Sequence, residues 1–313
     1  MSGEAFASRR VPWSAVIAFV LLACGLAWLV ALPLWLGAGL AEPLSWLVLV
    51  VMMLTPTVAT LIVTFALRSP PRSERLRFLG LWPLRPARRV IGLLVVGWLV
   101  PPVVVVLSVL VAAGLGFIRL DLAFSAYAAQ IEAAVPAGTP LPPIGLLVLS
   151  QFAMIPLAAL VNSIPALGEE LGWRGWLLPA LRPLGIWPTL LVSGVIWGLW
   201  HSPVILLGYN FGRTDATGVL LMVAGCVLWG VLLGWLRLRS ESVWPAVVAH
   251  GSLNASASLV VLVSATQPDM ALAGPLGVAG WIVTGAVIMV LLLTGAFRPR
   301  PEPVAASERV PAS

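Results

Sequence analysis

The side chains best suited to acid–base or metal chemistry lie in the most apolar parts of this sequence. The chain has two histidines, His201 and His250, and both fall inside stretches that are otherwise typical of membrane-spanning helices. Glu169, Glu170 and Asn254 lie at or just inside such stretches as well. Ionisable and polar groups are costly within a bilayer and usually face a protein-lined cavity there, so these residues mark a candidate functional site.

The two glutamates begin a short polar string that ends at Arg174. Neighbouring residues of a helix point about 100° apart, so the two carboxylates face different partners. Glu170 and Arg174 are four residues apart and can form an ion pair along one helix face, which leaves Glu169 to address a substrate or a water molecule. The alternative is an ordinary amphipathic turn at the membrane boundary, where charges cost little.

Each histidine has a neighbour at helical spacing. Trp197 precedes His201 by four residues and Asn254 follows His250 by four, so each pair shares a helix face. The alternatives are a histidine that bonds a backbone carbonyl and a His250–Asn254 pair that serves helix packing. Taken together, a carboxylate, two imidazoles and an amide supply the base, the ligands and the oxyanion donor that a water-activating hydrolase needs.

The composition places this chemistry in a membrane protein. Of the 313 residues, 60% are hydrophobic and 10% are charged, and the mean hydropathy is +1.03. Soluble domains are about 45–50% apolar and about 25% charged. The net charge of +6 does not indicate a nucleic-acid partner, because the arginines flank hydrophobic stretches instead of gathering on one helix face.

Eight stretches are long and apolar enough to cross a bilayer, which takes about 20 residues. They are Trp13–Leu36, Leu44–Leu67, Val90–Gly116, Ile144–Leu167, Trp187–Leu207, Ala216–Leu236, Val243–Val263 and Pro275–Ala296. We therefore predict an all-α polytopic membrane protein with about eight transmembrane helices and a buried polar site. A single transmembrane domain is predicted over residues 1–297, with the motifs in residues 144–263, and residues 298–313 are predicted to form a disordered cytoplasmic tail.

The arginines predict the orientation in the membrane. With eight spans and the N-terminus inside, sixteen of the eighteen arginines fall on the cytoplasmic side, and the other two are Arg119 and Arg213. Both termini are therefore expected in the cytoplasm. The alanine-rich, lysine-free composition suggests a bacterial source, so we expect the bacterial cytoplasmic membrane, with the site open to the cytoplasm.

The three motifs, in this order, resemble the CPBP family of intramembrane proteases. The motifs are Glu-Glu-x-x-x-Arg, then aromatic-x-x-x-His, then His-x-x-x-Asn, and they fall within Ile144–Val263. That family includes CAAX prenyl endopeptidases and bacteriocin-processing or immunity-associated (Abi) proteins. The sequence departs from the usual pattern at Trp197, where phenylalanine is more common, but an aromatic wall is kept.

The resemblance implies an intramembrane metalloendopeptidase that acts on a membrane-associated peptide or protein. Glu169 is implied to activate the attacking water, with Glu170 and Arg174 as a supporting pair. The remaining polar residues are implied to bind the water or a metal and to stabilise the tetrahedral intermediate: His201, His250 and Asn254. The resemblance leaves two alternatives open: a divalent metal ion, expected to be zinc held by His201 and His250, or a water activated by the glutamate alone. Asparagine is a poor zinc ligand, which weighs against a complete four-ligand zinc site.

Two other classes of function remain open. One is a non-proteolytic immunity or scaffold protein of the membrane, and the other is a transporter that uses the polar residues as a relay.

The two histidines lie at different distances from the starts of their apolar stretches. His201 is about 21 Å from Trp187, whereas His250 is only about 10 Å from Val243. We therefore predict that Gly168–Gly185 is a membrane-embedded helix that recesses the start of the next span.

Overall fold

The computed structural model describes residues 10–298, and within this range the chain is helical apart from loops and one isolated β-bridge between Leu120 and Ser264. The predicted tail beyond Arg298 lies outside the described residues. The α-helices are α1 (Trp13–Leu36), α2 (Ser45–Met53), α3 (Thr55–Phe65), α4 (Arg75–Phe78), α5 (Ala87–Gly114), α6 (Ser125–Ala134), α7 (Ile144–Glu170), α8 (Leu178–Leu181), α9 (Ile186–Trp200), α10 (Ser202–Ile205), α11 (Ala216–Ser240), α12 (Trp244–Ser256), α13 (Leu259–Leu262), α14 (Met270–Ala273) and α15 (Val278–Leu293). Three short 3₁₀ helices, η2 (Gly39–Ala41), η3 (Arg72–Glu74) and η5 (Arg182–Leu184), and one π-helix, η4 (Leu171–Leu177), complete the set.

Seven helical segments of the described chain are long and apolar enough to cross a membrane. They are Trp13–Leu36, Ser45–Phe65, Ala87–Gly114, Ile144–Leu184, Ala216–Ser240, Trp244–Leu262 and Met270–Leu293. This confirms the prediction of an all-α polytopic membrane protein.

The predicted stretch Trp187–Leu207 is the exception, because α9 has only 15 residues. The last turn of α9 tightens, with the His201 N–H donating to the Gly198 carbonyl three residues back. Pro203, which has no N–H to donate, lies in the separate short helix α10. His201 therefore lies at the C-terminal end of a short helix instead of inside a long one.

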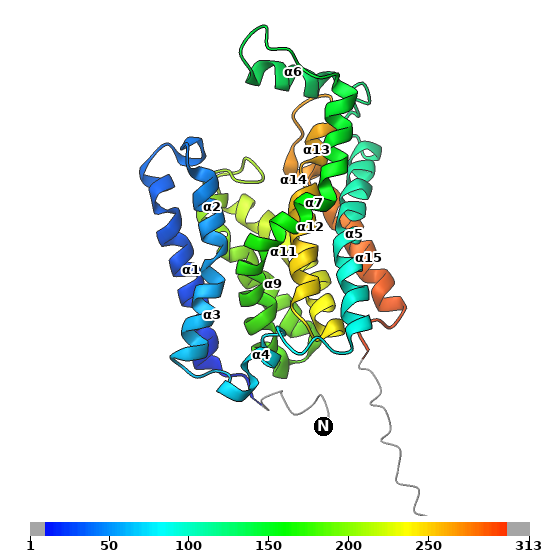
Figure 1. Cartoon of the computed structure of the whole chain (residues 1–313). Helices are drawn as coiled ribbons and strands as arrows, with labels where there is room; N and C mark the ends of the chain where they lie inside the picture. The colour runs from blue at the N-terminus through cyan, green and yellow to red at the C-terminus, as the bar shows by residue number, and fades with distance from the viewer. Residues whose placement is uncertain (1–9, 299–313) are drawn as a thin grey trace, which may run out of the picture.

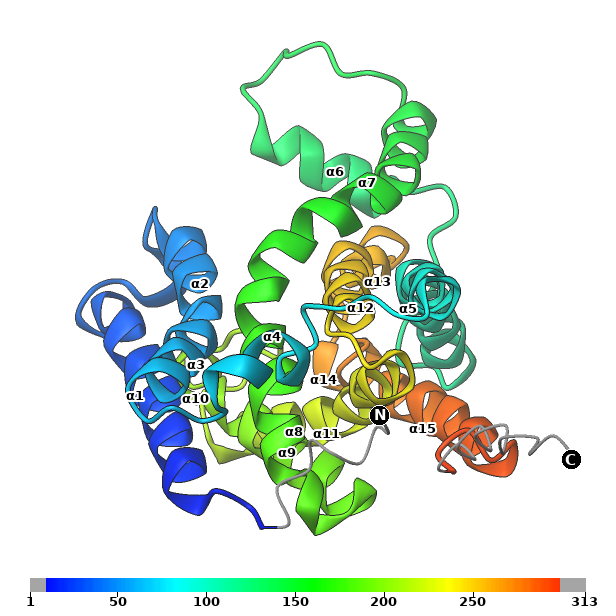
Figure 2. The same ribbon diagram turned by 60° about the horizontal axis from the view of Figure 1, so that its bottom comes forward.

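The helices form two groups with α7 between them. Figure 1 shows α1, α2 and α3 together at one edge of the molecule, and Figure 2 shows α7 between these helices and the α12–α5 group. The principal packing partners of α12 are α7 and α5, and α11 packs chiefly on α9. The motif-bearing helix α12 therefore packs directly on α7, and α11 lies between α12 and α9 and packs on both.

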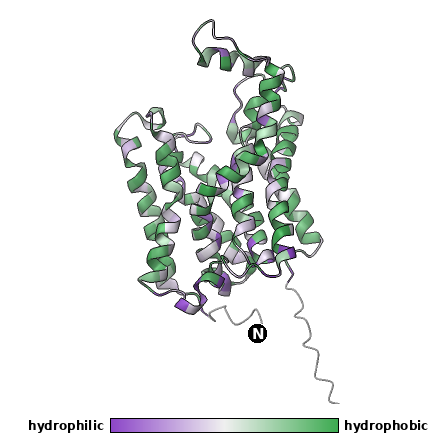
Figure 3. Cartoon of the chain, viewed as in Figure 1, coloured by the Kyte–Doolittle hydropathy of each residue, from purple (hydrophilic) through white to green (hydrophobic). Residues whose placement is uncertain are grey.

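The two ends of the bundle are polar and its sides are apolar. In Figure 3 hydrophilic residues gather at the end that holds α4 and around α6 at the opposite end, while the flanks of the helices are hydrophobic. Long apolar side chains such as Leu21 and Leu29 are more than half exposed on these flanks. An apolar band between two polar ends is the surface that a bilayer requires.

The segment after α7 is buried in the interior of the bundle. Every residue of η4 except Leu171 is buried. Trp173 and Trp176 of η4 both pack on Phe19 of α1, with ring centroids 5.6 and 5.0 Å away. The helical segment η4–α8 therefore continues α7 inside the bundle, and η5, which has no buried residue, leads to the start of α9.

Two glycines allow the motif helices to approach their neighbours closely. A Cβ atom on Gly251 of α12 would lie 2.5 Å from the Ala159 carbonyl oxygen of α7. A Cβ atom on Gly198 of α9 would lie 2.5 Å from the Cα atom of Val223 in α11. Because each glycine is adjacent to a motif residue, these contacts fix the depth of His250 and Trp197.

Candidate active site

Glu170 is the centre of a buried charged cluster. Its Oε1 atom accepts hydrogen bonds from Nη1 of Arg174 at 2.7 Å and from Nδ1 of His250 at 2.9 Å. All three side chains are buried. The Oε2 atom of Glu170 is sealed from solvent and has no partner among the described residues. The predicted Glu170–Arg174 pair is therefore present, and His250 joins it from a helix 80 residues away.

Glu169 has a different set of donors. Its Oε2 atom accepts a hydrogen bond from Nε1 of Trp197 at 2.7 Å and a longer one from Nε1 of Trp173 at 3.4 Å. Its Oε1 atom has no hydrogen-bond partner within residues 10–298, and it is not among the sealed atoms. One carboxylate oxygen is therefore held and the other remains free to accept a proton.

The two imidazoles are oriented in the same way. Nδ1 of His201 lies 2.9 Å from the Trp197 carbonyl oxygen, and Nδ1 of His250 lies 2.9 Å from Oε1 of Glu170. An oxygen acceptor requires the hydrogen on Nδ1, so in the neutral form of each ring the Nε2 atom keeps a free lone pair. This is the arrangement by which proteins orient an imidazole that binds a metal or a water molecule.

The indole of Trp197 contacts both imidazoles and the guanidinium of Arg174. Its ring centroid lies 5.8 Å from that of His201 and 5.4 Å from that of His250. The Cζ atom of Arg174 lies over its ring at 4.3 Å. The structure therefore gathers four of the six predicted site residues around one indole, Glu169, Arg174, His201 and His250, and Glu170 joins them through Arg174 and His250.

Asn254 is the sixth predicted residue, and it stands apart from the hydrogen-bonded cluster. It lies one helical turn beyond His250 on the same face of α12, and its side chain is exposed. In the described part of the chain, this amide makes no hydrogen bond. Asn254 is therefore the one predicted site residue that the structure does not join to the cluster.

Two aromatic residues near Glu169 were not selected from the sequence. Trp173 follows Glu169 by four residues, so helical spacing alone would have placed it on the same face. Tyr209 lies in the loop after α10, outside the candidate spans. Burial, and then the negative charge of Glu169, raises the pKa of the Tyr209 hydroxyl, which keeps it protonated. No spacing in the sequence links Tyr209 to the motifs.

A buried arginine connects η4 to the end of the bundle that holds α4. Nε of Arg237 donates to the Arg174 carbonyl at 3.0 Å, and Nη2 donates to the Phe78 carbonyl at 2.8 Å. The first of these carbonyls belongs to the π-helix, where the α-helical hydrogen-bond pattern is broken. Arg237 thus fixes the backbone of the segment that carries Arg174.

The described residues do not form a complete zinc site. His201 and His250 offer two ligands through Nε2, whereas catalytic zinc takes three protein ligands. Within residues 10–298 there is no group of three or more His, Cys, Asp or Glu side chains that could hold a metal ion. Zinc therefore stays a prediction of the family resemblance, which metal analysis of the purified protein tests.

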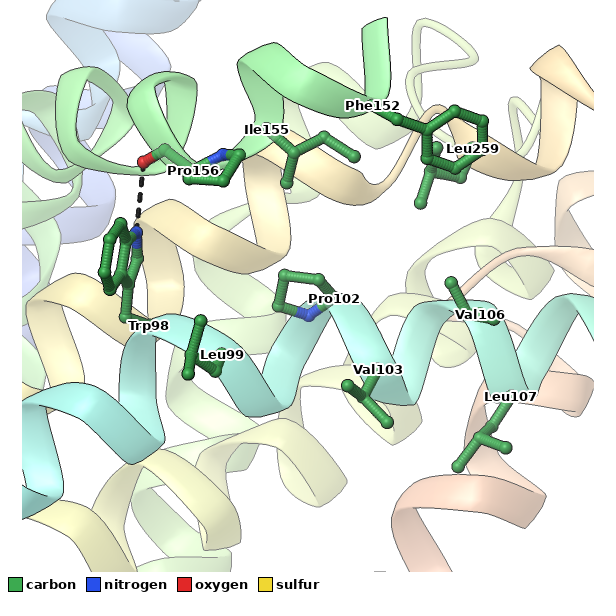
Figure 4. A pocket seen from close by; sticks show the side chains of 10 residues that line it. All are labelled: Trp98, Leu99, Pro102, Val103, Val106, Leu107, Phe152, Ile155, Pro156 and Leu259. Atoms are coloured by element: carbon green, nitrogen blue, oxygen red, sulfur yellow. Dashed lines mark hydrogen bonds between the residues drawn. The ribbon is translucent and has the colours of Figure 1, made fainter. Parts of the chain in front are cut away.

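An apolar groove of about 340 Å³ lies between α5 and α7 (Figure 4). It lies away from the side of α12 that carries His250. Its single visible polar contact is the hydrogen bond from Trp98 Nε1 to the Pro156 carbonyl at 3.0 Å. Ser252 of α12 donates to the Trp98 carbonyl, and on a helix it points about 200° away from His250. The groove is therefore separate from the polar cluster.

The comparison with protein-family models agrees with the motif order. Residues 150–256, about a third of the chain, match the model described as Rce1-like, type II CAAX prenyl endopeptidase Rce1-like. No curated protein matches the chain. The matched range contains all six predicted site residues and the helices that position them. Residues 150–256 are therefore similar to the Rce1-like type II CAAX prenyl endopeptidases, over the part of the chain that carries the motifs.

Proposed function

We propose that this protein is an intramembrane endopeptidase that hydrolyses a peptide bond with a water molecule activated by Glu169. The observation that carries the proposal is the difference between the two carboxylate oxygens of Glu169. Oε2 accepts hydrogen bonds from both indoles, while Oε1 has no hydrogen-bond partner among the described residues. A free carboxylate oxygen in the same cluster as two imidazoles is suited to take a proton from water. The Rce1-like match supports intramembrane protease activity.

The reaction follows from the donors and acceptors that are available. The water donates one hydrogen to Oε1 of Glu169 and the other to Nε2 of a histidine. As the water oxygen attacks the carbonyl carbon, Glu169 takes the proton and then passes it to the nitrogen that leaves when the C–N bond breaks. The oxyanion needs a donor, and both imidazole N–H groups are committed through Nδ1. The amide of Asn254 is the donor that remains.

The substrate in this proposal is a membrane-associated peptide or protein. Five of the six site residues lie on segments that qualify as membrane spans, and His201 follows the short apolar helix α9, so the scissile bond must come to the site within or beside the bilayer. The arginine distribution supports a cytoplasmic opening, and the composition supports a bacterial cytoplasmic membrane.

The test compares the membrane peptides of cells that make the wild type, Glu169→Gln or Glu132→Gln. Glu132 is an exposed glutamate of α6 and provides a matched control. Loss of a general base costs about 10²- to 10⁴-fold in rate. We therefore expect new N-termini, detected by labelling and mass spectrometry, with the wild type and with Glu132→Gln but not with Glu169→Gln.

The same product set from all three proteins would contradict the proposal and favour a non-proteolytic scaffold. The thermal denaturation temperature of Glu169→Gln in detergent must match that of the wild type. Glutamine still accepts the indole hydrogen bonds, so the variant is expected to keep the fold.

A further inference from the structure

Trp197 contacts four of the predicted site residues. Its Nε1 atom donates to Glu169, its ring lies under the guanidinium of Arg174, and its centroid is within 6 Å of both imidazole centroids. Its side chain is almost completely buried. A phenylalanine at this position would keep the ring contacts, but it has no N–H group to donate.

The hydrogen bond from Trp197 is short and is made to one oxygen only. The 2.7 Å distance between Nε1 and Oε2 lies in the range of charge-assisted hydrogen bonds, while the Trp173 distance of 3.4 Å is at the weak limit. The terminal torsion of a glutamate is broad and roughly two-fold, so an unbound carboxylate exchanges its two oxygens. A strong donor on Oε2 prevents that exchange and keeps Oε1 toward the free space.

The same indole also separates two charged groups. Arg174 lies over the ring face, and Glu169 is bonded at the N–H edge. If Glu169 turned away from that edge, the nearby guanidinium could bind it and remove the base from the reaction. Arg174 instead remains paired with Glu170 at 2.7 Å.

We propose that Trp197 is a positioning residue for the hydrolytic reaction, whose indole N–H holds Oε2 of Glu169 so that Oε1 faces the attacking water. This inference rests on the proposed function. It assigns to this chain a hydrogen bond that a phenylalanine at the same position cannot make.

The test uses Trp197→Phe, which keeps an aromatic ring and removes the donor. A hydrogen bond to a charged group corresponds to a factor of roughly 10 to 100 in rate. We expect kcat to fall by about tenfold or more, with KM within about twofold of the wild type because the substrate contacts are unchanged. Trp229→Phe is the matched control, since Trp229 is equally buried and its indole donates to the Pro275 carbonyl at 3.0 Å. Its kcat should stay within about twofold.

Two further measurements separate positioning from damage to the fold. Benzothienylalanine at position 197 has the shape of tryptophan with sulfur in place of the N–H, and it should reproduce the loss of kcat. The ¹⁵N–¹H signal of the Trp197 indole should shift in Glu169→Gln, while the signal of Trp229 should not.

The outcomes distinguish this inference from the function on which it rests. A Trp197→Phe variant with wild-type kcat, beside an inactive Glu169→Gln, would overturn the positioning role and leave the protease intact. A Trp197 indole signal with the same chemical shift in Glu169→Gln as in the wild type would overturn the positioning role as well. A wild type with no more activity than Glu169→Gln would overturn the proposed function itself.

Discussion

Glu169 and Glu170 are neighbours in the sequence, but each carboxylate has its own donors. The turn of a helix predicts this separation, and the structure confirms it: Glu170 binds Arg174, while Glu169 does not. The closer of the two donors to Glu169 is 28 residues away at Trp197, and the second donor to Glu170 is 80 residues away at His250. Spacing within a motif predicts which residues share a face, but partners from other helices depend on packing that spacing does not encode.

The buried ion pair leads to a prediction about stability. Removing one partner of a buried pair leaves a charge without compensation and costs about 3–5 kcal/mol. We therefore expect Arg174→Gln to lower the thermal denaturation temperature markedly, because Glu170 and Arg174 are both almost fully buried.

The chain contains a matched control for this experiment. Arg213 and Asp269 form an ion pair of 2.6 Å whose side chains are 44% and 36% exposed. Exposed pairs contribute about 0–1 kcal/mol, so Arg213→Gln should leave the denaturation temperature almost unchanged. Equal losses in the two variants would mean that the buried pair is solvated.

At the scale of single elements, the main difference between sequence and structure is the length of α9. The apolar residues continue from Trp187 to Leu207, so hydropathy predicts a full span, but the helix ends at Trp200. Hydropathy measures composition and does not register where the backbone hydrogen bonds change pattern. The π-helix η4 is hidden for the same reason, although its position next to the glutamates fits the tendency of such irregularities to occur at functional sites.

The contact between α9 and α11 gives a second prediction. Alanine at Gly198 would place its Cβ atom 2.5 Å from the Cα atom of Val223, so α9 must shift. Overpacking of this kind costs about 1–3 kcal/mol, and it displaces the adjacent Trp197. We expect Gly198→Ala to lower both the denaturation temperature and kcat.

Gly92 of α5 offers the comparison, because a Cβ atom there would meet nothing within 4 Å. Gly92→Ala should keep the activity and leave the denaturation temperature equal or higher, since alanine is the better helix former by about 1 kcal/mol. A kcat for Gly198→Ala as high as that for Gly92→Ala would show that the close α9–α11 contact is not needed.

At the scale of the whole molecule, the arginines remain the guide to orientation. Two of the residues assigned to the cytoplasmic side from the sequence are buried instead: Arg174 is 1% exposed and Arg237 is 8% exposed. Both serve internal hydrogen bonds, to Glu170 and to backbone carbonyls. The remaining arginines still favour the α4 end as cytoplasmic, because residues 68–89 alone carry seven of the sixteen assigned to that side.

Cysteine labelling of intact cells tests this orientation. Ser73 and Thr139 are both exposed and lie at opposite ends of the bundle, beside α4 and after α6 (Figure 1). In a Cys24→Ala background, we expect a membrane-impermeant maleimide to label Thr139→Cys in intact cells and Ser73→Cys only after lysis. Cys226 is buried and should not react with the maleimide. The reverse labelling would place the site on the outer side.

The cluster of Glu170, Arg174 and His250 has a consequence for protein engineering. Its sealed Oε2 atom and its desolvated charges lower stability compared with an apolar filling of the same volume, which is often neutral or better by about 1–4 kcal/mol. Single changes such as Arg174→Gln would be lost from a search for heat-resistant variants, but a search that replaces all three residues together by apolar ones can select against the cluster. The resulting proteins would be stable but inactive, so such a search has to measure the catalytic rate as well as the denaturation temperature.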